Sequence, residues 1–200
     1  MKKIIFTICF LGLFSTIHAQ AFKIGENRAS FGVGFGWTSN NVVKGSKSTH
    51  FPSPNALIER SVLPFKNFGF LSVGAQFGFH YGNHRGVGVL ANHDGQPIVN
   101  YKQSWTEIYF VPRIALYFHE IFYEDDFPEN IDLYGGIGIG FNFLSHRISP
   151  EVIGIGDNSG FKLGYNFFIG GRYYFKPQAS IFAELGYGLS FLNVGLTIRY

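Results

Sequence analysis

The chain has 200 residues, of which 46% are hydrophobic and 18% aromatic, and its formal net charge is +3. This length supports one domain. Its single cysteine, Cys9, lies together with Lys2 and Lys3 in a leading segment that has the pattern of a secretory signal. Removal of that segment leaves no thiol, which excludes disulfides and cysteine-based sites, and a net charge of about +1, which removes the main support for nucleic-acid binding.

The leading segment is predicted to be a cleaved signal peptide covering residues 1–19. Its basic start is followed by an apolar run from Ile4 to Phe14 and by a polar stretch that ends at Ala19. The apolar run is shorter than the roughly 20 residues that a membrane-spanning helix needs. We expect cleavage after Ala19, with cleavage after Ala21 as the alternative, and a mature domain over residues 20–200.

The rest of the chain contains eight segments in which bulky apolar residues alternate with glycines and polar residues. A period of two indicates β-strands, and segments of about ten residues with one apolar face are typical of strands that cross a membrane. Pro112 predicts a bulge or local distortion, because proline cannot donate a hydrogen bond to a strand ladder. The predicted strands are 29–38, 55–63 (the least regular), 69–81, 105–118, 131–143, 161–175, 180–187 and 192–200.

The last predicted strand shows the alternation most clearly, with Val194, Leu196, Ile198 and Tyr200 on one face and Arg199 on the other. Eight such strands in sequence predict an all-β fold, an eight-stranded antiparallel transmembrane up-and-down β-barrel. The alternative is a soluble barrel of the lipocalin type, which would place its charged face outside. The charges are too few to cover a soluble exterior.

The predicted connections alternate in length. Those over 39–54, 82–104 and 144–160 are long, whereas 64–68 and 176–179 are tight. Long extracellular loops and short periplasmic turns are the pattern of outer-membrane barrels, and an even strand count leaves both termini periplasmic.

One turn departs from this pattern. The segment 119–130 is longer than a turn requires and carries five acidic residues. We interpret it as a solvated acidic loop, with a cation or partner site in the periplasm as the alternative.

Several charged residues fall on positions that face the barrel interior. An eight-stranded barrel is just wide enough for side chains to fill it, and buried charges must be paired. We therefore predict an ion-pair network that plugs the lower half of the lumen, with a charged constriction in a pore as the alternative. The predicted members are Glu107, Arg113, Asp132, Arg172, Glu184 and Arg199.

The long loops are more basic than the opposite rim. Lys44, Lys47, Arg85 and Arg147 lie in or beside them and are predicted to contact phosphates of the outer-membrane lipid and lipopolysaccharide. Ordinary surface charge is the alternative interpretation.

Motifs for catalysis or cofactor binding are weak. The glycines of segment 134–140 recur at strand period and do not open a helix, so they do not predict a nucleotide site. His80, His84 and His93 lack a fixed ligand spacing, and His146 lacks an acidic residue placed to orient it. We predict a protein that is not an enzyme and binds no cofactor or metal.

The C-terminal 30 or so residues resemble a known class. The segments 170–175, 182–188 and 194–200 are similar to the end of the small outer-membrane β-barrel superfamily, that is, the porin-family or OmpA/OmpX-like barrel domain. The resemblance extends over the mature chain in pattern and over about the last 30 residues in motif. It implies that Val194, Leu196, Ile198 and Tyr200 form the signal read by the barrel-assembly machinery.

The resemblance also implies a location and a range of roles. It implies a Gram-negative outer membrane. We expect a monomer at the cell surface and, because the mature chain has little net charge, no binding of nucleic acid. The function expected is structural or surface-interacting, with a side-chain-filled lumen. The alternative is a narrow channel or carrier for small solutes.

Overall fold

The computed structural model of the protein describes residues 24–36, 47–65, 68–91, 97–118, 128, 130–149, 159–188 and 190–200. These residues form nine β-strands, and none of them forms a helix long and apolar enough to cross a membrane. The strands are β1 (Asn27–Phe35), β2 (Lys47–His50), β3 (Ser53–Phe65), β4 (Gly69–Ala91), β5 (Pro97–Tyr117), β6 (Ile131–Ser149), β7 (Gly160–Lys176), β8 (Ala179–Tyr187) and β9 (Leu192–Arg199).

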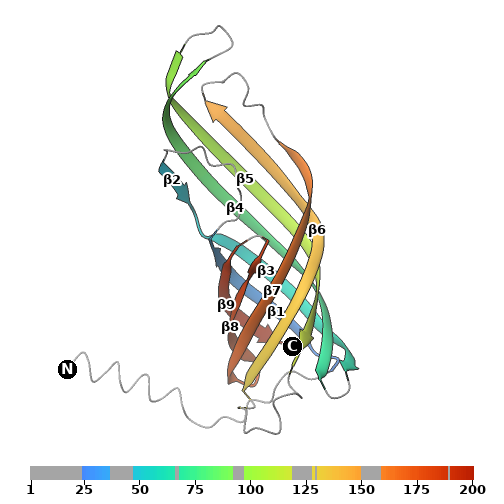
Figure 1. Ribbon diagram of the computed structural model, residues 1–200. Helices are drawn as coiled ribbons and strands as arrows, with labels where there is room; N and C mark the ends of the chain where they lie inside the picture. Colours follow the sequence, from blue (N-terminus) through green and yellow to red (C-terminus); the bar gives the residue numbers. More distant parts are fainter. Residues whose placement is uncertain are drawn as a thin grey trace, which may run out of the picture.

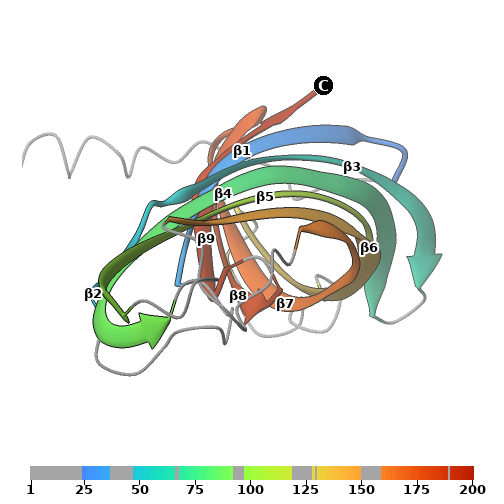
Figure 2. The ribbon, with the colours of Figure 1, turned by 90° about the horizontal axis from the view of Figure 1, so that it is seen from above.

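Eight of these strands close into a ring in which every neighbour is antiparallel (Figures 1 and 2). Each strand of the ring pairs with the next one along the chain, and β1 closes the ring by pairing with β9 from Arg28↔Arg199 to Phe35↔Leu192. The remaining strand, β2, is a four-residue addition that pairs with β4 beyond the end of its ladder with β3. The predicted eight-stranded antiparallel barrel is therefore confirmed.

The two faces of the wall have opposite chemistry. On the outside, Ile137, Ile139 and Phe141 are each more than 60% exposed, whereas Arg28 and Ser72 on the inside are 0% exposed. A soluble protein buries its apolar residues, but here the apolar residues are outside and the polar ones are packed inside. This arrangement is that of a barrel whose solvent is lipid, so the strands are transmembrane.

The height of the apolar wall fits a bilayer. On β6 the outward apolar residues extend from Leu133 to Phe143. The 11 residues from Leu133 to Phe143 rise about 33 Å, and a tilt of about 40° converts this to about 25 Å along the membrane normal, the height of the apolar band of a transmembrane barrel.

The wall is much taller on one side than on the other. Strand β4 has 23 residues and β5 has 21, whereas β8 has 9 and β9 has 8. Figure 1 shows β4, β5 and β6 continuing well beyond the rim formed by β1, β8 and β9. We call this extension, formed by residues 82–91, 97–105 and 145–149, the β-arm.

The β-arm explains where the predicted strand bounds are too short. Strand pairing between β4 and β5 continues through Arg85↔Lys102 to Ala91↔Pro97, so most of the predicted loop 82–104 is strand. The alternation that marks a membrane strand stops where the wall leaves the lipid, but backbone pairing does not require an apolar face.

Pro112 does not produce the predicted bulge. The β5–β6 ladder keeps its register from Phe110↔Phe141 to Arg113↔Gly138, with the two intervening pairs missing. The distortion is therefore an interruption of the ladder, as expected from a residue without an N–H. A register shift occurs instead between Ser61 and Leu63 of β3.

Both ends of the described chain lie at the same end of the barrel as the tight turns. The N–H of Asn27 donates to the carbonyl of Tyr200, and the two-residue turn after Lys176 lies nearby, where the Arg199 N–H donates to the carbonyl of Gln178. We call this the terminal end. Most of the acidic segment 119–130 and the loop that holds Lys44 fall outside the described residues.

Candidate functional site: a charged plug in the lumen

The lumen near the terminal end holds a cluster of four buried charges, which we call the lower cluster. Arg28 of β1 lies 3.4 Å from both Glu59 of β3 and Asp132 of β6, and Arg172 of β7 lies 3.8 Å from Glu59. All four side chains are at most 1% exposed. Two guanidinium groups therefore face two carboxylates across the barrel, which is the pairing that buried ions require.

Hydroxyl groups donate further hydrogen bonds to the carboxylates of the lower cluster. Ser72 and Tyr117 donate hydrogen bonds to the Glu59 carboxylate at 2.6 and 3.1 Å, and Tyr174 donates to Asp132 at 2.9 Å. Arg172 donates to the Tyr117 hydroxyl at 3.1 Å. These bonds join β4, β5 and β7 to the cluster and hold the charged groups at one depth.

A second ion pair crosses the lumen further from the terminal end. Arg113 of β5 donates to both carboxylate oxygens of Glu184 of β8, at 2.7 and 3.2 Å, and Tyr134 donates to the same carboxylate at 3.0 Å. The guanidinium carbon of Arg113 also lies 3.5 Å from the centre of the Phe168 ring. This two-pronged pair links strands that are not neighbours in the wall, so it ties the two sides of the barrel together.

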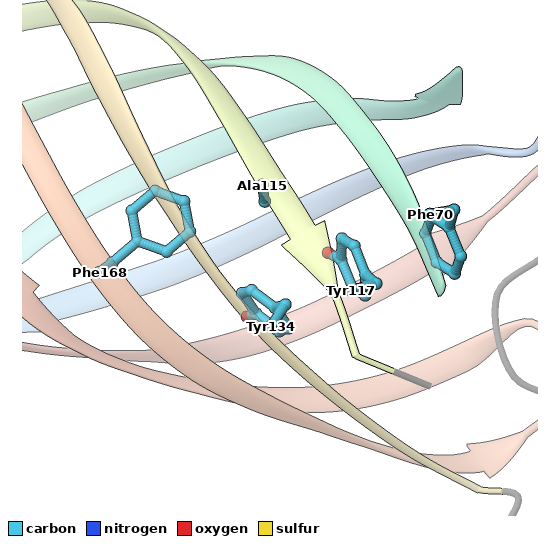
Figure 3. Close-up of a cluster of buried hydrophobic side chains, with 5 residues drawn as sticks. All are labelled: Phe70, Ala115, Tyr117, Tyr134 and Phe168. Carbon is cyan, nitrogen blue, oxygen red and sulfur yellow. The ribbon is translucent and has the colours of Figure 1, made fainter. Parts of the chain in front are cut away.

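A row of aromatic rings lies beside these guanidinium groups, and Figure 3 shows its four members, Phe70, Tyr117, Tyr134 and Phe168. Phe70 stacks on Tyr117 with ring centres 4.7 Å apart, and Tyr117 stacks on Tyr134 at 4.9 Å. Tyr134 meets Phe168 edge-on. The row crosses four strands, β4 to β7, and its faces contact Arg28, Arg172 and Arg113 in turn, which favours the cations further.

A layer of carboxamides covers the second ion pair. Asn55 and Asn193 exchange hydrogen bonds of 2.9 and 3.3 Å, Gln76 donates to Asn55, and Asn166 donates to Gln76. A cavity of about 30 Å³ lies beside this layer and the Glu184 carboxylate. That volume accommodates about one water molecule.

The structure brings four of the six predicted network residues together and separates two. Arg113, Asp132, Arg172 and Glu184 lie in the two ion-paired layers. Glu107 is only part-buried and accepts a hydrogen bond from Asn142, nearer the β-arm. Arg199 lies at the rim, where it pairs with Glu26 at 3.2 Å, because it is the last residue of its strand.

The ion pairs do not follow strand register. Asp132 is the register neighbour of Arg172 on β6, but the ion pair of Arg172 is with Glu59, and Asp132 pairs with Arg28. Arg28 and Glu59 were not predicted as members of the network. Their spacing could have identified them. Arg28 lies two residues from Ser30, and Glu59 lies two residues from Ser61, so each points into the lumen with its buried neighbour. The predicted first strand began one residue after Arg28, and the second strand was too irregular to orient.

Among the other predicted contact residues, those whose side chains the structure describes lie on the outer face of the barrel. Arg85 and Arg147 are exposed on the outer face of the β-arm. The backbone of Lys47 pairs with that of Arg85 through β2, and Lys44 lies outside the described residues. On the terminal strand, Leu196, Ile198 and Tyr200 are more than half exposed on the outer face.

The described residues hold no cluster of three or more metal-ligating side chains. His80 is buried and its Nδ1 lies 2.6 Å from the Ser53 hydroxyl, and His84, on the same strand face, is 1% exposed. Both residues are packed into the wall of the upper lumen. The structure thus places both in the interior of the barrel: His80 on the predicted strand 69–81, and His84 in the strand that replaces the predicted loop 82–104.

Comparisons with known proteins found structural neighbours but no sequence relatives. No family model matches the chain, and no curated protein matches it. The crystal structure of Ail, the attachment invasion locus protein of Yersinia pestis, is similar with 14% identity and a TM-score of 0.42, covering 89% of this chain and 100% of that one. The outer membrane protein OprG from Pseudomonas aeruginosa is similar with 10% identity and a TM-score of 0.41, covering 92% and 99%. The N-terminal β-barrel domain of Pseudomonas aeruginosa OprF is similar with 10% identity and a TM-score of 0.37, covering 89% and 98%. The fold assignment rests on the strand pairings and the sidedness of the wall described above.

Proposed function

We propose that this protein is a non-enzymatic, monomeric β-barrel of a Gram-negative outer membrane, with a structural or surface-interaction role. The observation that carries the proposal is the plug: the described buried charges are three arginines and three carboxylates, all held in ion pairs. The described buried charges then sum to zero, and the paired side chains occupy the space that an ion or solute would have to cross. The barrel then serves as a rigid anchor in the membrane.

The terminal end is proposed to face the periplasm and the β-arm to face the outside. The tight turns and both chain ends support this orientation, because short turns lie on the periplasmic side in this class of barrel. The β-arm would then stand above the membrane surface and form the part of the molecule that a partner meets first.

Contact with lipid phosphates is proposed for the outer face of the β-arm. Arg85, Lys102 and Arg147 are exposed there. They lie two or three outward positions beyond Phe79, Ile108 and Phe143, which form the last apolar row on these strands. Each outward position advances about 7 Å along the tilted strand, which puts these residues about 11–16 Å above the apolar row, at the outer edge of the headgroup layer or beyond it. Their long side chains can reach back toward the phosphates from there. Arginine binds phosphate bidentately, and lipopolysaccharide supplies such phosphates.

Recognition by the barrel-assembly machinery is proposed for the terminal strand. Val194, Leu196, Ile198 and Tyr200 alternate with inward residues, and three of them are exposed along its outer face. A folding partner can read that apolar row before the strand pairs with β1.

A test of the plug uses planar bilayers. Purified wild-type protein and a Glu184→Gln variant are reconstituted at equal density, and their conductance is compared with that of bilayers without protein. The proposal expects no steady conductance from the wild type and fractionation with outer membranes. Steady wild-type conductance, or a soluble periplasmic protein, would contradict it.

A narrow channel is the second candidate. The cavity of about 30 Å³ beside Glu184 favours it, because a polar space for one water lies next to the ion pair that closes the lumen. Conductance that rises in the Glu184→Gln variant above the wild type would support this reading.

A further inference from the structure

The lipid-facing wall has a long hollow near the terminal end. Two adjoining cavities of about 510 and 640 Å³ share Gly171 of β7 and Ala183 of β8. The two residues are register neighbours, with Leu133 on the far side of Gly171 and Val194 on the far side of Ala183. One row of the wall therefore has small side chains at its centre and larger ones at both ends. We call the joined cavities the wall groove.

Packing of the fold does not require glycine at position 171. A Cβ placed there would lie 3.5 Å from its nearest neighbour, the Leu133 Cδ2, which is an ordinary contact. The next residue inward, Gly170, is different, because a Cβ there would lie 2.8 Å from the Tyr134 ring and 2.9 Å from Glu184. Gly170 makes room for the plug, whereas Gly171 leaves a space that nothing in the barrel fills.

The surroundings of the wall groove identify what fills it. Its sides are apolar, and the flanking Ile169 and Leu196 are 66% and 57% exposed within the band that faces the lipid. The groove is continuous with that band, so its occupant is drawn from the hydrocarbon. An unfilled hollow would lose the dispersion contacts of its lining, and water gains no hydrogen bonds there.

We propose that the wall groove binds one acyl chain of a membrane phospholipid in the leaflet at the terminal end. The groove would hold the chain by close packing, because hydrophobic transfer supplies no preference between a lipid tail and an apolar wall. An exposed cation, Lys176, ends β7 five residues beyond Gly171, about 17 Å along the strand. That position suits the phosphate of the same lipid and favours a phospholipid over a second copy of the barrel.

Native mass spectrometry tests the proposal. The barrel is reconstituted with dioleoyl phosphatidylethanolamine, extracted in detergent, and the lipid retained per barrel is counted. The wild type is expected to retain one lipid. Ala183→Leu and Gly171→Leu, which fill the groove from its two sides, are expected to reduce retention at least about fivefold, because a packed site tolerates extra methylenes poorly.

Ala75→Leu is the matched control. Ala75 faces outward from β4, on a different part of the wall, where it pairs with Ile58 and Pro112. This variant is expected to retain lipid as the wild type does, and the gel mobility of unheated samples checks that all variants are folded. Equal retention by wild type and both groove variants would overturn the proposal, as would a wild-type barrel without lipid. A wild-type dimer that Ala183→Leu dissociates would overturn it in favour of a second copy as the occupant.

Discussion

The ion pair between Arg113 and Glu184 gives the sharpest test of the plug. Glu184→Gln preserves the volume of the side chain but removes its charge and leaves the Arg113 guanidinium, which is 1% exposed, without a counter-ion at 2.7 Å. Breaking a buried pair by removing one partner costs about 3–5 kcal/mol. Because the glutamine oxygen still accepts one of the two hydrogen bonds, we expect a loss near the lower limit, about 3 kcal/mol of unfolding free energy.

Urea unfolding in phospholipid vesicles measures this loss, with gel mobility of unheated samples as the readout of the folded barrel. The double variant Arg113→Met with Glu184→Met is expected to recover much of the stability, since it removes both charges and fills the same space. Glu26→Gln is the control for a pair of the same chemistry at the rim. The Glu26–Arg199 pair has side chains 29% and 11% exposed, so its loss is expected to cost less than about 1 kcal/mol. Equal effects of Glu184→Gln and Glu26→Gln would refute the argument that the lumen excludes solvent.

Three further predictions concern the wall, the lower cluster and the β-arm. Gly140→Ala is expected to destabilise the barrel by about 1–3 kcal/mol, because its Cβ would lie 2.6 Å from the Val111 Cα, whereas Gly171→Ala is expected to be neutral or slightly stabilising; the same urea assay compares them. Tyr117→Phe is expected to cost about 2 kcal/mol, because its buried hydroxyl bonds both Glu59 and Arg172; Tyr173→Phe on the outer face is the control, and equal losses would contradict the prediction. Arg85→Gln with Arg147→Gln is expected to weaken binding to lipopolysaccharide vesicles and to reduce its dependence on salt, and unchanged binding would rule out phosphate contacts at the β-arm.

The alternation of residues along each strand predicted which way most of the charged side chains point. It could do so because alternate residues face opposite sides of the wall, and a charged residue on the wrong side would lie in lipid. The structure has Arg113 and Asp132 at 2% and 1% exposure, in agreement with that alternation. Alternation does not indicate which charges meet. Arg113 and Glu184 are 71 residues apart on strands that are not neighbours, so their contact depends on how the ring closes.

The features that sequence reasoning missed have two physical causes. Arg28 and Arg199 lie near strand ends, where alternation fades: Arg28 turns fully into the lumen, and Arg199 stays at the rim with Glu26. The β-arm was missed because polar and charged residues such as Asn83, Arg85 and Lys102 interrupt the apolar alternation, although the backbones pair as far as Ala91↔Pro97. Apolar alternation therefore identifies only the part of a strand that faces lipid, and it does not identify the part that continues beyond the membrane.

The pairing of β1 with β9 has a consequence for the order of events in folding. Every other pair of neighbouring strands in the ring is also consecutive along the chain. The β1–β9 pairing, which we call the seam, joins residues more than 150 positions apart. Arg28 of β1 forms its ion pairs with residues of β3 and β6 within the lower cluster. The seam therefore forms late and needs the complete chain, and a slow closing step is expected from such distant contacts. Until it forms, two open sheet edges would have to enter hydrocarbon, which excludes them, so closure and insertion are expected to occur as one event.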